Sequence, residues 1–316
     1  MNLHHEAIAA EARIREHVRL TPVGSSQIPG GNVLLKHENY QRTGSFKLRG
    51  AFNRLLVMPQ SDRARGVVAA STGNHGAAVA CAARELGTTA TIFAPANADP
   101  SKLHNITNHG GTIVQQGDDC VVAEAAARAH AETHDMVYVS PYNDPAVVAG
   151  QATLGVELDR QLDEFDAVFI ALGGGGLLGG VGGFLKACRP DVEVVACSPA
   201  NSCVMHESIP AGRILDLPSL PTLSDGTAGG VEADSITFEL CREVIDHRIL
   251  VSEAQIAEAM RILLIDHHTM VEGAAAVTLA AYLAEAERYR DRRVVLVLCG
   301  ANASQSVLRN VLGSKP

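Results

Sequence analysis

Short apolar segments alternate along the chain with stretches whose apolar residues recur every three to four positions. The run Gly66–Ser71, for example, precedes a stretch of helical periodicity from about Asn74 to Leu86. Similar apolar runs occur at Thr89–Ala94, Thr112–Gln115, Ala167–Leu172, Val192–Cys197 and Val294–Cys299. Continuous apolar strands that alternate with helices are typical of parallel sheets buried on both faces. The pattern therefore predicts an α/β fold of mainly parallel sheets covered by helices.

The periodic pattern is weakest between residues 202 and 246, where Pro and Gly recur. A structureless loop of that length is uncommon in a compact domain, so we expect a long ordered excursion there. The whole chain has 316 residues, which exceeds the usual size of one domain. We therefore expect one large domain or two medium ones.

Charge and cysteine content narrow the class of protein. The net charge is −9 with scattered basic residues, which argues against a nucleic-acid partner. The apolar runs are shorter than the ~20 residues that span a bilayer, and the N-terminus lacks a signal-peptide pattern. Seven cysteines without a Cys-x-x-Cys pair indicate reduced thiols and a cytoplasmic location. We expect four of them to be small core residues: Cys81, Cys120, Cys188 and Cys241.

A lysine occupies the first turn of a predicted helix, where its charge is disfavoured. Ser45 is a suitable N-cap, and apolar residues follow at helical spacing from Leu48 onward. The ammonium group of Lys47 would then face the positive end of the helix dipole. Such a placement calls for a functional reason.

Four consecutive glycines, Gly173 to Gly176, follow the apolar run that ends at Leu172. Converging backbone N–H groups and the next helix N-terminus would form an anion site, with phosphate as the natural guest. A turn needed only for tight packing is one alternative. A dinucleotide fingerprint, Gly174-x-Gly176-x-x-Gly179, is another, but the next strand ends in Cys197-Ser198-Pro199 instead of an acidic residue.

Two further turns carry polar groups. Ser71-Thr72-Gly73-Asn74-His75-Gly76 lies between a strand and a helix, where it could grip a carboxylate or act only as an ordinary cap. Cys299-Gly300-Ala301-Asn302 follows the last apolar run and would place a thiol at the carboxyl edge of a sheet, where ligands of such sheets bind. For Cys299 alone, a buried structural role is the default.

These turns, together with Ser45-Phe46-Lys47-Leu48-Arg49-Gly50-Ala51, occur in the order and spacing of one family. The chain resembles the pyridoxal-phosphate enzymes of the tryptophan-synthase-β fold (fold type II), in the serine/threonine dehydratase and serine racemase branch. The resemblance covers nearly the whole chain, from about residue 11 to the last strand. It implies two domains, a large one formed by 1–65 and 144–316 and a small inserted one at 66–143, with the cofactor in the cleft between them.

The resemblance also implies roles for individual residues. Lys47 would hold pyridoxal phosphate as a Schiff base and later act as base, beside Phe46. Asn74 would bind the 3′-oxygen of the cofactor, and Cys299 would face its pyridine nitrogen. Glu272 stands where relatives carry Glu-Pro, and it is assigned to the cofactor site. The phosphate would be bound by Gly173, Gly174, Gly175, Gly176 and Leu177, and the substrate carboxylate by Ser71, Thr72, Gly73, Asn74 and His75.

The reaction implied is β-elimination of water from a hydroxy-amino acid, by default L-threonine or L-serine, to give a 2-oxo acid and ammonia. Thr72 stands where dehydratases carry Ala and serine racemases Ser. A hydroxyl there, opposite Lys47, could return a proton, so an isomerase remains an alternative. Thr72 and the segment Ser224–Glu232 also resemble the dehydratase-like proteins of hydroxyectoine utilisation, and 3-hydroxyaspartate is a further substrate option. A nicotinamide dehydrogenase and a non-catalytic binding module are the weakest alternatives.

Cations and partners complete the expectations. The acidic pair that binds a divalent cation in serine racemases would fall near Ser198 and Val204, neither of which is acidic, so no metal is expected there. Asp266-His267-His268 is expected to lie late in a helix, where histidines interact favourably with the dipole, and this interpretation is preferred to metal ligands. We expect a homodimer by resemblance, with no nucleic-acid or membrane partner.

Overall fold

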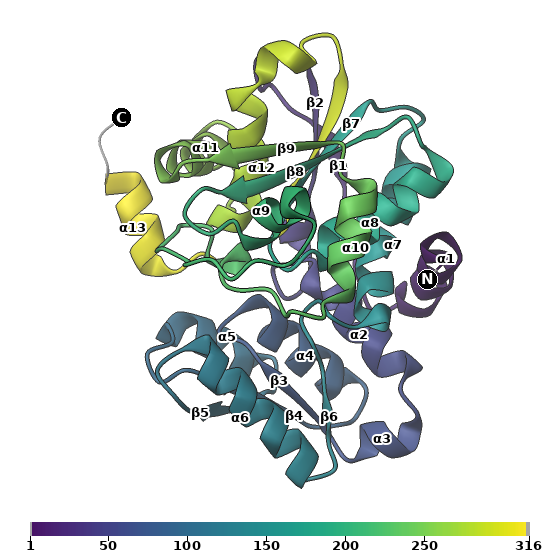
Figure 1. The fold of residues 1–316 in the computed structure, drawn as a ribbon, viewed down its shortest axis with the longest axis vertical. Helices are drawn as coiled ribbons and strands as arrows, with labels where there is room; N and C mark the ends of the chain where they lie inside the picture. Colours follow the sequence, from purple (N-terminus) through teal and green to yellow (C-terminus); the bar gives the residue numbers. More distant parts are fainter. Residues whose placement is uncertain (1, 314–316) are drawn as a thin grey trace.

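The computed structural model describes residues 2–313, which form two sheets with helices packed around them (Figure 1). The larger sheet has the strand order β1-β2-β10-β7-β8-β9, and only β1 runs antiparallel to its neighbour. Its strands are β1 (Val23–Ser25), β2 (Asn32–Lys36), β7 (Ala167–Ala171), β8 (Glu193–Pro199), β9 (His247–Val251) and β10 (Arg293–Val297). The predicted α/β class with mainly parallel sheets is confirmed.

The smaller sheet is entirely parallel and uses one continuous stretch of the chain. Its order is β5-β4-β3-β6, formed by β3 (Val67–Ala70), β4 (Ala90–Ala94), β5 (Thr112–Gln115) and β6 (Val137–Tyr138). All six apolar runs named above are strands, with ends that shift by two residues at most. The boundaries 65/66 and 143/144 as limits of folding units stay a prediction.

Helices pack on both sheets and between them. The helices are α1 (Leu3–Ile14), α2 (Lys47–Val57), α3 (Gln60–Ala64), α4 (Asn74–Glu85), α5 (Pro100–Asn108), α6 (Cys120–Thr133), α7 (Pro145–Gln161), α8 (Gly176–Cys188), α9 (Val204–Ala211), α10 (Ile236–Val244), α11 (Glu253–Ile265), α12 (Gly273–Ala284) and α13 (Gln305–Gly313), with 3₁₀ turns η1 (Glu38–Tyr40), η2 (Asp225–Thr227) and η3 (Ala286–Tyr289). Helix α2 packs against both α7 and α4, so it joins the helices of the two sheets.

The excursion at 202–246 is ordered, since it contains α9, η2 and α10. Two local expectations are wrong. Cys120 is exposed because it begins α6 at the surface, whereas Cys81 and Cys241 are buried. Asp266 and the histidines after it lie just beyond the end of α11, not within its last turn.

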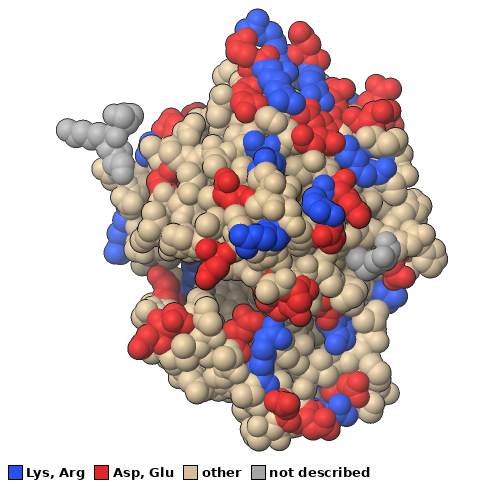
Figure 2. All heavy atoms as spheres, in the orientation of Figure 1, with Lys and Arg blue, Asp and Glu red and all other residues tan. Residues whose placement is uncertain are grey.

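No helix in the described residues 2–313 is both long enough and apolar enough to cross a membrane. The surface is hollowed between the part built on the larger sheet and the part built on the smaller one (Figure 2). Strands β3, β7 and β10 are each followed by one of the polar turns named above. Parallel strands present their carboxyl ends at one edge, where ligands bind in sheets of this kind.

Candidate active site

A pocket gathers side chains from segments far apart in the sequence. Its lining is Phe46, Lys47, Asn74, Tyr142, Ala171, Gly173, Gly174, Gly175, Gly176, Leu177, Gly226, Thr227, Glu272, Ala274 and Cys299. The lysine stretch, the glycine turn, Glu272 and Cys299 thus meet at one place, and Asn74 joins them from the smaller sheet. Ser71, Thr72, Gly73 and His75 do not line this pocket, so their predicted contact with a substrate stays a prediction.

Lys47 is the first residue of α2, as expected, and it is partly buried. Its Nζ donates to the carbonyl oxygen of Pro141 at 2.8 Å and lies 5.3 Å from the centre of the Phe46 ring. Burial lowers the pKa of the Lys47 ammonium to about 8, although Cys299 and Glu272 oppose the shift. About one tenth of Lys47 is therefore a free amine at pH 7, the form that a nucleophile or base requires.

The expected N-cap of this helix is wrong. Phe46 is the cap residue and makes no side-chain capping bond, while Ser45 pairs with Gly300 as an isolated β-bridge. The Ser45 hydroxyl is buried without a hydrogen-bond partner among the described residues. A tertiary contact with the loop after β10 thus displaces the local capping preference. The same pairing places Cys299 beside the start of α2, because the Phe46 N–H donates to its carbonyl oxygen at 3.0 Å.

The glycine turn connects β7 to α8 and lines the pocket. Gly175 has φ +83°, a conformation that favours glycine, and α8 begins at Gly176. A Cβ on Gly174 would lie 2.5 Å from the ring of Tyr142, so no larger residue fits against that ring. Gly176 and Leu177 open the helix, and their N–H groups have no partner within it. The turn therefore has the shape and the dipole of an anion site.

The turn between β3 and α4 is built differently. The N–H of Gly73 donates to Ser71 Oγ at 3.1 Å, and α4 begins at Asn74. The His75 ring is buried, with Nε2 2.8 Å from the carbonyl oxygen of Val139. Burial lowers the pKa of His75 to about 3, and the charge of Lys47 adds to the shift, so the ring is neutral at pH 7. A contribution of His75 to carboxylate binding would have to come from its backbone.

Glu272 is a buried carboxyl group with two hydrogen-bond donors. Asn74 Nδ2 donates to its Oε1 at 2.7 Å, and the backbone N–H of Asn302 donates to its Oε2 at 3.1 Å. Burial, together with the nearby charge of Asp225, raises the pKa of Glu272 to about 7, although Lys102 and the two hydrogen bonds oppose the shift. Glu272 therefore titrates close to neutral pH inside the pocket.

Cys299 lies just beyond the end of β10 and is 3% exposed. Burial, followed by the charge of Glu272, raises the pKa of its thiol far above the usual value. The group is therefore a neutral thiol at physiological pH and presents no formal charge to the pocket.

Five pocket residues were not predicted as site residues from the sequence: Tyr142, Ala171, Gly226, Thr227 and Ala274. Tyr142 packs against the glycine turn, and its hydroxyl accepts from the Glu232 N–H at 3.0 Å. The only local signal is an aromatic residue inside the turn-rich stretch Pro141–Pro145. Thr227 lies in η2 with its backbone against Gly173, a contact between segments that no local pattern indicates.

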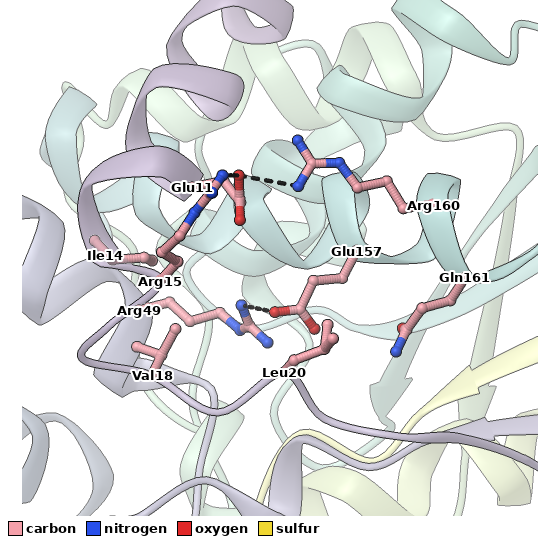
Figure 3. A pocket seen from close by; sticks show the side chains of 9 residues that line it. All are labelled: Glu11, Ile14, Arg15, Val18, Leu20, Arg49, Glu157, Arg160 and Gln161. Atoms are coloured by element: carbon pink, nitrogen blue, oxygen red, sulfur yellow. Dashed lines mark hydrogen bonds and ion pairs between the residues drawn. The ribbon is translucent and has the colours of Figure 1, made fainter.

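A second cavity, of about 410 Å³, lies between α1, α2 and α7 (Figure 3). Its charged groups are already paired with one another. Arg49 contacts Glu157 at 2.7 Å, and Glu11 contacts both Arg15 and Arg160. Because its charged side chains satisfy one another, this cavity offers less chemistry than the Lys47 pocket.

Comparison with known proteins agrees with this geometry. The family model described as "Pyridoxal-phosphate dependent enzyme" matches residues 14–300. The L-threonine ammonia-lyase of Thermotoga maritima is 38% identical over 287 residues, which are 91% of this chain and 71% of that protein. The L-threonine ammonia-lyase of Geobacter sulfurreducens is 36% identical and covers 93% of this chain and 74% of its own length.

Among solved structures, maize serine racemase superposes with a TM-score of 0.92 at 31% identity, covering 98% of this chain and 96% of that one. The predicted family and its two-part fold are thereby confirmed. The chain belongs to the pyridoxal-phosphate dependent enzyme family, in the fold type II group.

Proposed function

We propose that this chain is a pyridoxal-phosphate-dependent ammonia-lyase that removes water from a hydroxy-amino acid such as L-threonine or L-serine. The products would be a 2-oxo acid and ammonia. The observation that carries the proposal is the Lys47 amine, with its pKa lowered to about 8, in one pocket with a helix N-terminus that can bind phosphate. The names of the relatives from Thermotoga maritima and Geobacter sulfurreducens support the lyase reaction.

The pocket residues fit the cofactor. A Cβ on Gly173 or Gly174 would collide with Thr227 or Tyr142, so the tight turn requires glycine there. The first N–H groups of α8 would bind the phosphate. Asn74 would donate to the cofactor from one side, and the neutral thiol of Cys299 would face the ring nitrogen without a charge. When bound, pyridoxal phosphate would supply the electron sink for the carbon from which a proton is removed.

The side chains of the chain itself would handle the proton. Lys47 would attach the cofactor, and after release its amine would take the proton from the substrate Cα. Its lowered pKa suits that task, since the free amine forms at a small cost in free energy. The neutral Cys299 thiol would leave the ring nitrogen largely unprotonated, which favours β-elimination over transamination.

A racemase is the second candidate, because the chain matches maize serine racemase closely and carries a hydroxyl at Thr72. Formation of D-serine without 2-oxo acid would favour it. Dehydratases of hydroxyectoine utilisation or of 3-hydroxyaspartate remain substrate alternatives within the lyase class. In all of these, the proposed substrate-binding residues are Ser71, Thr72, Gly73, Asn74 and His75.

The test begins with the colour and the adduct. The purified protein should be yellow, and borohydride should fix the cofactor to Lys47 in a peptide digest. The protein would then be incubated with L-threonine, L-serine, 3-hydroxyaspartate and hydroxyectoine-derived amino acids, with 2-oxo acid and ammonia measured. A colourless protein without stoichiometric cofactor would contradict the proposal.

Oligomeric state, location and domain closure are also part of the proposal. We infer a homodimer in the cytoplasm, with the part at 66–143 closing over the substrate. Light scattering on the active protein tests the dimer, and an active monomer at dilute concentration would contradict it.

A further inference from the structure

The loop after β10 carries one side chain that reaches both parts of the molecule. Asn302 Nδ2 donates to the carbonyl oxygen of Thr43 at 2.8 Å and to Asn74 Oδ1 at 2.6 Å. Its Oδ1 accepts from Asn105 Nδ2 at 3.4 Å, and its backbone N–H donates to Glu272. Asn302 thereby links the segment before α2, the helices α4 and α5, and the Glu272 carboxyl group in the pocket.

The hydrogen bonds around Asn302 decide which way its amide points. The Thr43 carbonyl can only accept a hydrogen bond, so the Asn302 atom beside it must be the NH₂ group. The Asn74 atom that faces the same NH₂ group must then be its oxygen. Asn74 consequently presents its own NH₂ group to Glu272 and keeps one N–H for another acceptor.

The backbone makes room for this arrangement. A Cβ on Gly44 would lie 2.7 Å from Asn302 Oδ1, and one on Gly300 would lie 2.3 Å from Glu272 Oε1. Larger side chains at either glycine would push the network apart. The loop is also fixed by the Ala301 N–H, which donates to the carbonyl oxygen of Gly44 at 2.8 Å.

We propose that Asn302 is a positioning residue that fixes the orientation of the Asn74 amide, so that an N–H donor and not an oxygen is available to the bound cofactor. The Thr43 carbonyl group orients the Asn302 amide, and the Asn302 amide in turn orients the Asn74 amide, whose NH₂ group faces Glu272. Asn302 itself does not line the pocket and acts only through Asn74. The inference rests on the proposed cofactor role of the pocket.

The test compares two replacements of Asn302 by the affinity of the folded apoprotein for pyridoxal phosphate, measured by absorbance titration. Asn302→Ala removes the orienting bond, and one lost hydrogen bond should weaken binding about tenfold. Asn302→Asp keeps the shape but places oxygens against Thr43 and Asn74. The Asn74 amide then turns and points its oxygen toward Glu272, so binding should weaken about a hundredfold.

The order of the two variants separates orientation from packing. Asp is closer to Asn in shape, so a role in packing alone predicts the milder effect for Asn302→Asp. Asn105→Ala, which removes only the 3.4 Å contact on the other side of the Asn302 amide, is the matched control and should change affinity less than about threefold.

Affinities of both Asn302 variants within twofold of wild type, or Asn302→Asp milder than Asn302→Ala, would overturn the inference. If Asn302→Asp does not fold, as judged by circular dichroism, the affinity of Asn302→Ala decides alone. Failure of wild type to bind the cofactor would instead contradict the proposed function, so the two failures are distinguishable.

Discussion

Lys36 is fully buried and Lys47 is partly buried, and the surroundings of the two lysines differ. Lys36, on β2, has an acceptor for each of its three N–H groups: the Thr21 carbonyl oxygen at 2.9 Å, Glu157 Oε2 at 2.5 Å and Gln161 Oε1 at 2.9 Å. For Lys47 the described residues provide one acceptor, the Pro141 carbonyl oxygen. Burial lowers the pKa of both lysines.

The difference shows how one fold can hold a lysine in a structural ion-pair network and leave another lysine free to react. Lys36 belongs to a buried network in which Arg49 pairs with both Glu38 and Glu157 at 2.7 Å. A buried ion whose hydrogen-bonding groups all have partners has a structural role, because removal of one partner leaves an uncompensated charge and lowers the free energy of unfolding. Lys47, two residues before Arg49 in the same helix, lacks a carboxylate partner at bonding distance in the described chain. It is therefore available to react.

The largest expected effect is on catalysis and comes from Lys47→Ala. Loss of the proposed general base should reduce elimination by ~10²–10⁴-fold or more, while the fold persists because no buried ion pair is broken. The measurement is 2-oxo acid release per folded molecule, with the thermal midpoint as control. Retained elimination at the wild-type rate would remove Lys47 from the mechanism.

The next effect is on stability and comes from Lys36→Met. The free energy of unfolding should fall by about 3–5 kcal/mol, because Glu157 loses a buried partner. Denaturant titration measures the loss. The double variant Lys36→Met/Glu157→Gln should recover part of it, since no uncompensated charge remains. If Lys36→Met is as stable as wild type, the buried network around Lys36 does not stabilise the fold.

The third prediction concerns the pH dependence of apoprotein stability. The folded chain holds the Lys47 proton more weakly than the unfolded chain, so this group makes stability rise between pH 8 and 10.5, by about 3 kcal/mol. Glu272 acts in the opposite direction: its raised pKa makes stability fall as pH rises from 4.5 to about 7. Lys47→Met should remove the first slope from the difference curve and Glu272→Gln the second. Unchanged slopes would contradict the assigned shifts.

The smallest effect is expected from an exposed ion pair. Glu239 and Arg242 lie one turn apart on α10 at 2.6 Å, with both side chains about half exposed. Glu239→Gln should change the free energy of unfolding by less than about 0.5 kcal/mol, because solvent screens the pair. A loss as large as that of Lys36→Met would mean that burial does not distinguish the two classes of charge.

The parts of the site that could be predicted from the sequence are those marked by a local pattern of neighbouring residues. The glycine run predicts an anion site because four adjacent glycines after a strand are unusual, and the turn lies at the end of β7 as expected. Lys47 was singled out by its place at a helix start, and the family resemblance supplied its role. Tyr142 was missed because it reaches the pocket from an irregular segment, where no periodicity indicates which side chains point inward.

The sequence by itself determined the alternation of strands and helices, the parallel sheets and the resemblance of four motifs to one family. These properties depend on residues close together in the chain, where hydrophobic periodicity and turn chemistry operate. Only the tertiary structure decided that Ser45 pairs with Gly300 and does not cap α2, and that the His75 ring hydrogen-bonds to the carbonyl oxygen of Val139. The lowering of the Lys47 pKa by burial is likewise a tertiary effect. Those outcomes depend on desolvation and on partners more than 60 residues away, which local sequence does not specify.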